Sequence, residues 1–119
     1  MKVTTLILNT KGEPHFESVD HLNTEQLVSF AKDREQLARE KGAEWTMGAV
    51  TFFGSELVKA VNTGEHKDVS MAVTNMVMAA WLLDSLYCGV TVDQYRESDF
   101  RFVVADNGAV AHTRLPAAK

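Results

Sequence analysis

VSMAVTNMVMAAWLL, residues 69–83, is a run of fifteen residues without a formal charge, and its apolar positions recur at the spacing of a helix. Ser70, Thr74 and Asn75 make the run too polar, and its length makes it too short, to cross a bilayer core about 30 Å thick. We therefore predict a helix of a soluble protein over residues 69–87. Its main apolar stripe is formed by Val69, Val73, Met76, Ala80, Leu83 and Tyr87.

The opposite side of the predicted helix is also largely apolar. One interpretation is a central helix that packs between a sheet and another helix. The other is self-association, because methionine thioethers and tryptophan are enriched at protein interfaces. The second interpretation predicts a symmetric homodimer whose interface contains Met71, Asn75, Met78, Trp81 and Leu82.

Strands are predicted where β-branched and aromatic residues form short runs between turn residues. Residues 2–9 and 15–19 flank the turn sequence Lys-Gly-Glu-Pro and predict a hairpin. Residues 100–105 and 109–115 flank Asp-Asn-Gly and predict a second hairpin. Residues 45–53, with Thr, Val and two Phe before a glycine, predict a central strand.

Helices are predicted in the remaining segments. Asn23 is a suitable N-cap for a helix from Thr24 to Gly42, where glycine is a suitable C-cap. Residues 57–61 predict a short helix, and residues 92–97 predict one more helical turn. The order β-β-α-β-α-β-β predicts one α+β domain over residues 1–119, with an antiparallel sheet of about five strands and two main helices on one face.

Composition narrows the class of protein. With 45% apolar and 24% charged residues in 119 positions, the chain has an ordinary globular balance. The net charge of -4 is divided evenly along the sequence, and no cluster of Arg and Lys is present, which disfavours direct nucleic-acid binding. A single cysteine, Cys88, and an N-terminus without a basic and apolar leader predict a cytoplasmic protein without disulfides or a membrane anchor.

No motif for catalysis, metal binding or a cofactor stands out. The four histidines do not converge at a metal-ligand spacing, and the sequence contains neither a phosphate-binding loop nor a nucleophile elbow. Cys88 falls at the C-terminal end of a predicted helix, where the macrodipole disfavours a thiolate, so we expect a buried and unreactive thiol. We therefore assign no catalytic, metal or cofactor residues.

Three functions follow from this pattern. The first is a non-enzymatic, acidic cytoplasmic oligomer that regulates or inhibits another macromolecule, as accessory proteins of phages and mobile elements do. The second is a small-ligand or nucleotide-binding domain with its pocket at the long helix or a subunit junction. The third is a small hydrolase-type enzyme with an unidentified site. The polar contacts for the second function would be Arg34, Thr74, Asn75 and Tyr87.

Overall fold

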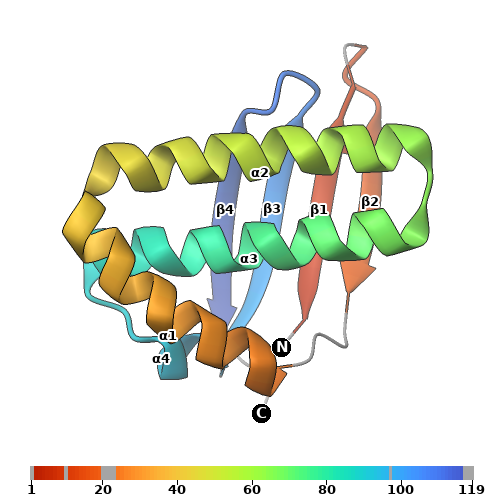
Figure 1. The fold of residues 1–119 in the computed structure, drawn as a ribbon. Helices are drawn as coiled ribbons and strands as arrows, with labels where there is room; N and C mark the ends of the chain where they lie inside the picture. The colour runs from red at the N-terminus through yellow and green to blue at the C-terminus, as the bar shows by residue number, and fades with distance from the viewer. Residues whose placement is uncertain (1, 10, 20–23, 97, 117–119) are drawn as a thin grey trace.

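The computed structural model describes residues 2–9, 11–19, 24–96 and 98–116. Two strands are followed by four helices and two further strands (Figure 1). The strands are β1 (Val3–Leu8), β2 (Pro14–Val19), β3 (Ser98–Ala105) and β4 (Val110–Pro116). The helices are α1 (Thr24–Lys41), α2 (Ala43–Thr63), α3 (His66–Cys88) and α4 (Val92–Arg96). The predicted α+β class and both terminal hairpins are confirmed, whereas the predicted cap Asn23 lies outside the described residues.

The sheet is mixed and has four strands in the order β2-β1-β3-β4, so the predicted antiparallel sheet of about five strands is wrong in both respects. Each hairpin is antiparallel, but β1 and β3 run parallel, with Leu6 beside Val103. Parallel neighbours require a long crossover connection. The four helices between the hairpins provide it, and the second hairpin therefore returns alongside β1.

The strand predicted over residues 45–53 is wrong, because these residues belong to the continuous helix α2. The short helix predicted at residues 57–61 is the last part of the same helix, so three long helices replace the predicted two. The buried positions of α2 recur every three or four residues rather than alternating, which is the helical period. They are Thr46, Val50, Gly54, Leu57, Val58 and Ala60.

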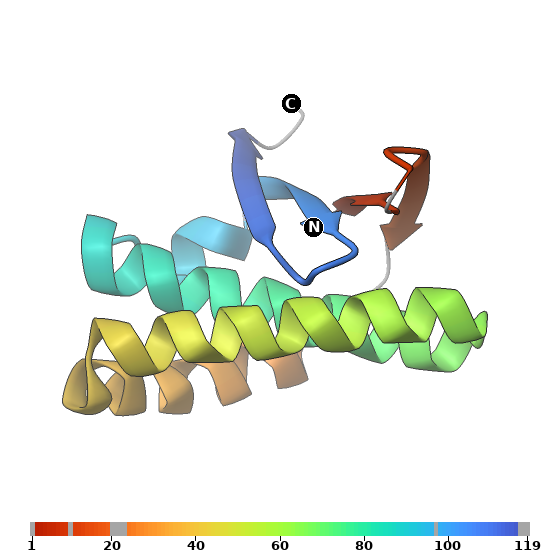
Figure 2. The same ribbon diagram turned by 90° about the horizontal axis from the view of Figure 1, so that it is seen from above.

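α3 is the central element of the fold. Figure 2 shows the sheet on one side of α2 and α3, and α1 on the other side. On the sheet side, Trp81 packs against Tyr95 and Phe100, with ring centroids 5.5 and 6.5 Å away. All three side chains are buried, and truncating a core aromatic of this kind typically costs about 3–5 kcal/mol. Although α3 is long and apolar enough to span a membrane, 61% of its most apolar window is buried, as in the core helix of a soluble protein.

Gly54 allows α2 to approach the β3–β4 turn closely. A Cβ atom at this position would overlap the Val110 side chain and lie 2.9 Å from the carbonyl oxygen of Gly108. The Gly108 oxygen is a backbone atom, which cannot move away from the added Cβ as the end of a flexible side chain can. Glycine is therefore required by packing at this point of the helix.

We predict that Gly54→Ala lowers the free energy of unfolding by about 1–3 kcal/mol, the usual cost of overpacking. Gly48→Ala is the matched control on the same helix, because a Cβ there meets no atom within 4 Å. Alanine at that position should instead stabilise the protein by up to about 1 kcal/mol through helix propensity. Urea unfolding of both variants would measure the difference, and equal effects would contradict the close approach at Gly54.

Candidate interaction surface

The outer face of the helices carries large apolar side chains that the fold leaves exposed. Phe52 on α2 and Met71 on α3 are 59% and 57% exposed, and Phe30 on α1 is 44% exposed. Trp45 lies near the start of α2 and is also exposed. Scattered surface apolar residues are ordinary, but large ones gathered on one face typically mark a binding surface.

A cleft of about 520 Å³ separates these exposed side chains, where α1, α2 and α3 meet. Its floor includes Met78 and Leu82 of α3, while Phe30, Trp45 and Phe52 stand around it. Arg34 and Asn75 are the polar side chains in the lining. The guanidinium of Arg34 lies 4.7 Å from the ring centroid of Phe30, which holds its charge at the edge of the apolar cleft.

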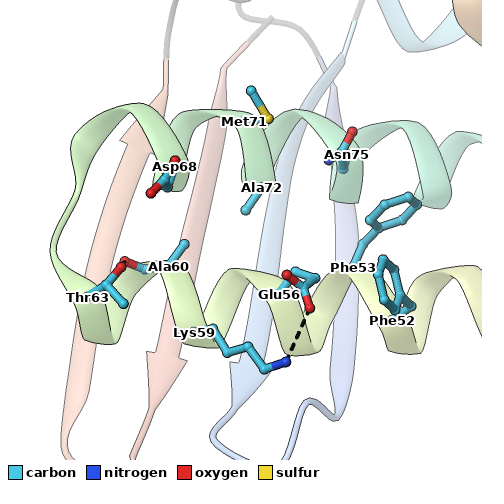
Figure 3. Close-up of a pocket in the computed structure, with 10 residues that line it drawn as sticks. All are labelled: Phe52, Phe53, Glu56, Lys59, Ala60, Thr63, Asp68, Met71, Ala72 and Asn75. Carbon is cyan, nitrogen blue, oxygen red and sulfur yellow. Dashed lines mark hydrogen bonds and ion pairs between the residues drawn. The ribbon is translucent and has the colours of Figure 1, made fainter.

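The cleft continues along α2 and α3 as a second hollow of about 370 Å³ (Figure 3). Phe52, Phe53 and Asn75 line both hollows, so the two form one surface, which we call the outer groove. The second hollow has polar side chains at its margin. Lys59 is 3.3 Å from the Glu56 carboxylate, and Asp68 stands on the opposite helix (Figure 3).

The predicted interface residues are divided between two sides of α3. Met71 is exposed and half-buried Asn75 lines both hollows. Met78 and Leu82 also line the groove but are nearly covered within the monomer, at 6% and 3% exposed. Trp81 faces the sheet and is fully buried, so it presents no surface to a partner.

The predicted ligand contacts are also brought together only in part. Arg34 and Asn75 line the same cleft. Thr74 lines neither hollow, and its hydroxyl donates a hydrogen bond to the Ser70 carbonyl oxygen one turn earlier. Tyr87 is exposed near the end of α3 and lines neither hollow.

Sequence reasoning missed the aromatic residues of the groove. Phe30 was not identified from the sequence, and Trp45 and Phe52 were placed in a predicted strand. A helical period through residues 43–63 would have placed Trp45 and Phe52 seven positions apart, on one side of a helix and away from the buried positions. The signal was therefore present in the sequence, but it depended on the correct secondary structure for this segment.

A polar cluster lies apart from the groove, where α3 and α4 meet β4. The His112 Nε2 atom is 3.8 Å from the Asp84 carboxylate, and Arg114 lies over the ring of Tyr95. The Tyr95 hydroxyl donates to the Ala80 carbonyl oxygen at 3.4 Å. Cys88 is exposed, contrary to the expected buried thiol. Among the described residues, no three His, Cys, Asp or Glu side chains are close enough to hold a metal ion.

Burial raises the pKa of Tyr95 far above its usual range, and the neighbouring Asp84 carboxylate raises it further against the opposing charge of Arg114. The folded protein therefore keeps this phenol protonated at a pH where the unfolded chain ionises it. Since a tyrosine in an unfolded chain titrates near pH 10, stability should fall as the pH rises above about 10.

We predict that Tyr95→Phe reduces this alkaline loss of stability, while at neutral pH it costs about 0.5–1.5 kcal/mol through the lost hydrogen bond. Tyr87→Phe is the control, because Tyr87 is exposed and its removal should leave the loss unchanged. Chemical unfolding between pH 8 and about pH 11 would measure both variants. An unchanged pH dependence in Tyr95→Phe would show that Tyr95 ionises freely in the folded state.

Comparison with known proteins gives no match: no family model, curated protein or solved structure resembles this chain significantly.

Proposed function

We propose that this chain is a non-enzymatic interaction protein of the cytoplasm, which binds an amphipathic helix of a partner protein in the outer groove. The observation that carries the proposal is the set of exposed aromatic and methionine side chains around a floor formed by α3. Aromatic and methionine side chains are the types most enriched where proteins bind one another. Regulation or inhibition follows if the bound helix is one that the partner uses elsewhere.

The length of the groove favours a helix as its occupant. Its lining on α2 extends from Trp45 to Thr63, which corresponds to about 27 Å at a rise of 1.5 Å per residue. A helix of about five turns matches this length, whereas a compact ligand would fill only one hollow. Apolar grooves between helices bind amphipathic helices through side chains spaced three and four residues apart.

The helix α1 shows how another helix is seated on this side of the molecule. It buries Leu27, Val28, Ala31 and Ala38 and covers only part of the helical layer (Figure 1). Its Arg39 side chain donates to the hydroxyl of Ser85 on α3 at 3.5 Å. A partner helix in the outer groove would cover the neighbouring part of the same layer.

The charges at the two ends of the groove suit the dipole of a helix. Asp68 lies at one end of the lining and Arg34 at the other. A bound helix places partial positive charge at its N-terminus and partial negative charge at its C-terminus. We therefore expect the N-terminus of the partner helix beside Asp68.

Site-specific photo-crosslinking at residue 52, in the cells that naturally produce the protein, tests this proposal. We expect the photoreactive residue to label one partner polypeptide, on one side of a single helix. Met71→Glu should abolish this labelling without unfolding the protein, because Met71 is exposed and a charge there stays hydrated.

Residue 47 provides the matched control. Met47 is exposed on the same helix but lines a different cleft, beside the β3–β4 turn. Labelling at residue 47 should not yield the same partner. The proposal fails if positions 47 and 52 give the same products, or if Met71→Glu leaves the labelling at residue 52 unchanged.

A second candidate function is binding of an amphiphile with a carboxylate group. The volume of about 520 Å³ suits a small ligand, and the guanidinium of Arg34 at the edge of the cleft suits a carboxylate. We predict that dodecanoate binds more tightly than dodecanol and that Arg34→Met removes the difference. Calorimetric titration of both compounds would measure it, and equal affinities in the unmodified protein would exclude this candidate.

A further inference from the structure

The sheet has a second face that none of the described helices covers. Figure 2 shows the helices on one side of the strands only. Val3, Thr5 and Ile7 of β1 face the helices and are buried, while the alternating Thr4, Leu6 and Leu8 are half-exposed. The same alternation in β3 places Arg101 and Val103 on the uncovered face.

Apolar residues cross this face in a continuous row. The strand register places Phe16, Leu6, Val103 and Ala111 side by side across β2, β1, β3 and β4. A second row, of Pro14, Leu8 and Ala105, lies beside it. Phe16, the largest apolar side chain of this face, is 63% exposed. In a soluble protein, the uncovered face of a sheet more commonly carries polar residues, which alternate along each strand with the apolar residues of the covered face.

We propose that the uncovered face binds the same face of a second copy of this chain, with a two-fold axis parallel to the strands. The inference is independent of the proposed function, because the outer groove lies on the opposite side of α2 and α3. Such an axis places β2 of one copy over β4 of its partner, and β1 over β3. Two-fold interfaces require a surface that is complementary to itself under this exchange.

The side-chain sizes in the apolar row make the face complementary to itself under this exchange. Phe16, the largest member, is placed over Ala111, the smallest, at both ends of the interface. Leu6 is placed over Val103 at the centre. Packed sheets usually lie at about 30° to one another, so the axis is tilted from the strands by about half that angle, which displaces the centre of the interface least.

The charged residues at one end of the central strands are also complementary under this two-fold exchange. Lys2 lies beside Asp99 at the end of the central strands, where its backbone N–H donates to the Asp99 carboxylate at 2.9 Å. Exchanging β1 and β3 places the Lys2 side chain of each copy near Asp99 of the other. The interface therefore brings Lys2 and Asp99 together twice, and it places Arg101 of each copy near Thr4 of the other and, across the axis, near the other Arg101.

The area is sufficient for a specific dimer. Four strands paired over about six residues form a face about 19 Å wide and 20 Å long, given usual strand spacing and rise. Two such faces in contact, with side chains interdigitating, bury on the order of 1,000 Å² in total, the lower limit for a specific interface. We therefore expect a reversible dimer whose population depends on concentration.

Sedimentation velocity over a concentration series tests the assembly. Phe16→Glu should raise the dissociation constant of the dimer by roughly tenfold or more, because it places a charge in the apolar row. Phe52→Glu is the matched control, an equally exposed phenylalanine on the outer groove, and should leave the dimer unchanged. Circular dichroism verifies that both variants remain folded. A monomer at every concentration overturns the proposal, as does a dimer lost in Phe52→Glu but retained in Phe16→Glu.

Charge exchange provides a second measurement that does not depend on Phe16. Lys2→Glu should weaken the dimer, and combining it with Asp99→Lys should restore it. Failure of the double variant to recover the dimer would exclude the proposed pairing.

Photo-crosslinking in an equal mixture of ¹⁴N- and ¹⁵N-labelled protein identifies the strands in contact. A photoreactive residue at position 16 should form mixed-isotope products with β4 of the other copy. Mixed products with β2 instead would show pairing of strand edges and overturn the face-to-face arrangement.

Discussion

The structure depends on the burial of α3 on two sides. A helix in a small α+β domain usually buries one stripe and leaves the rest to water, but α3 is covered from Met76 to Leu82 around its whole circumference. Trp81 supplies the contact with the sheet through Tyr95 and Phe100. Met78 and Leu82, on the other side, are covered by α1 and α2. The fold therefore needs a layer on each side of α3: the two hairpins supply the sheet on one side, and the connection between them supplies α1 on the other.

This arrangement explains why the exposed apolar surface is on the outside of the molecule. The sheet lies on one side of α3, whereas α1 covers only part of the other side. Phe52 and Met71 consequently remain exposed next to a floor that is already buried. The sheet also has an uncovered surface, since a sheet covered on one face leaves the other face to solvent or to a partner.

Local patterns predicted those parts of the fold that local interactions determine. The alternation in β1 and β3, the Asn-Gly turn before β4 and the uncharged run in α3 each indicate their structure within a few residues. Residues 45–53 were misread because Thr, Val and Phe favour a strand by propensity, whereas the apolar spacing that makes α2 a helix continues beyond Gly54 to Leu57 and Val58. The parallel pairing of β1 with β3 joins residues almost a hundred positions apart, and no local signal indicates it.

The sequence predicted individual residues of the candidate site from patterns within single helices, but not how those helices meet. Asn75, Met78 and Leu82 belong to α3 and were identified from its second apolar side, and Arg34 was predicted as a polar ligand contact on the helix from Thr24 to Gly42. Their meeting in one groove depends on how α1 crosses α2 and α3, which is a property of tertiary packing. Trp81 was predicted at the interface, but in the helical period it lies between the two apolar sides, and the structure buries it against the sheet.

The positions of the two surfaces limit what an assembly of this protein can do. A dimer formed through the sheets would place the helical layers outermost, so its two outer grooves would face in opposite directions. One short, rigid partner could not occupy both grooves at once, and avidity would require a flexible partner or two partner copies. The dimer would therefore act as a bivalent connector between separate partner helices, whereas the monomer would bind and mask only one. Protein concentration would then select between these two modes, because it sets the fraction of dimer.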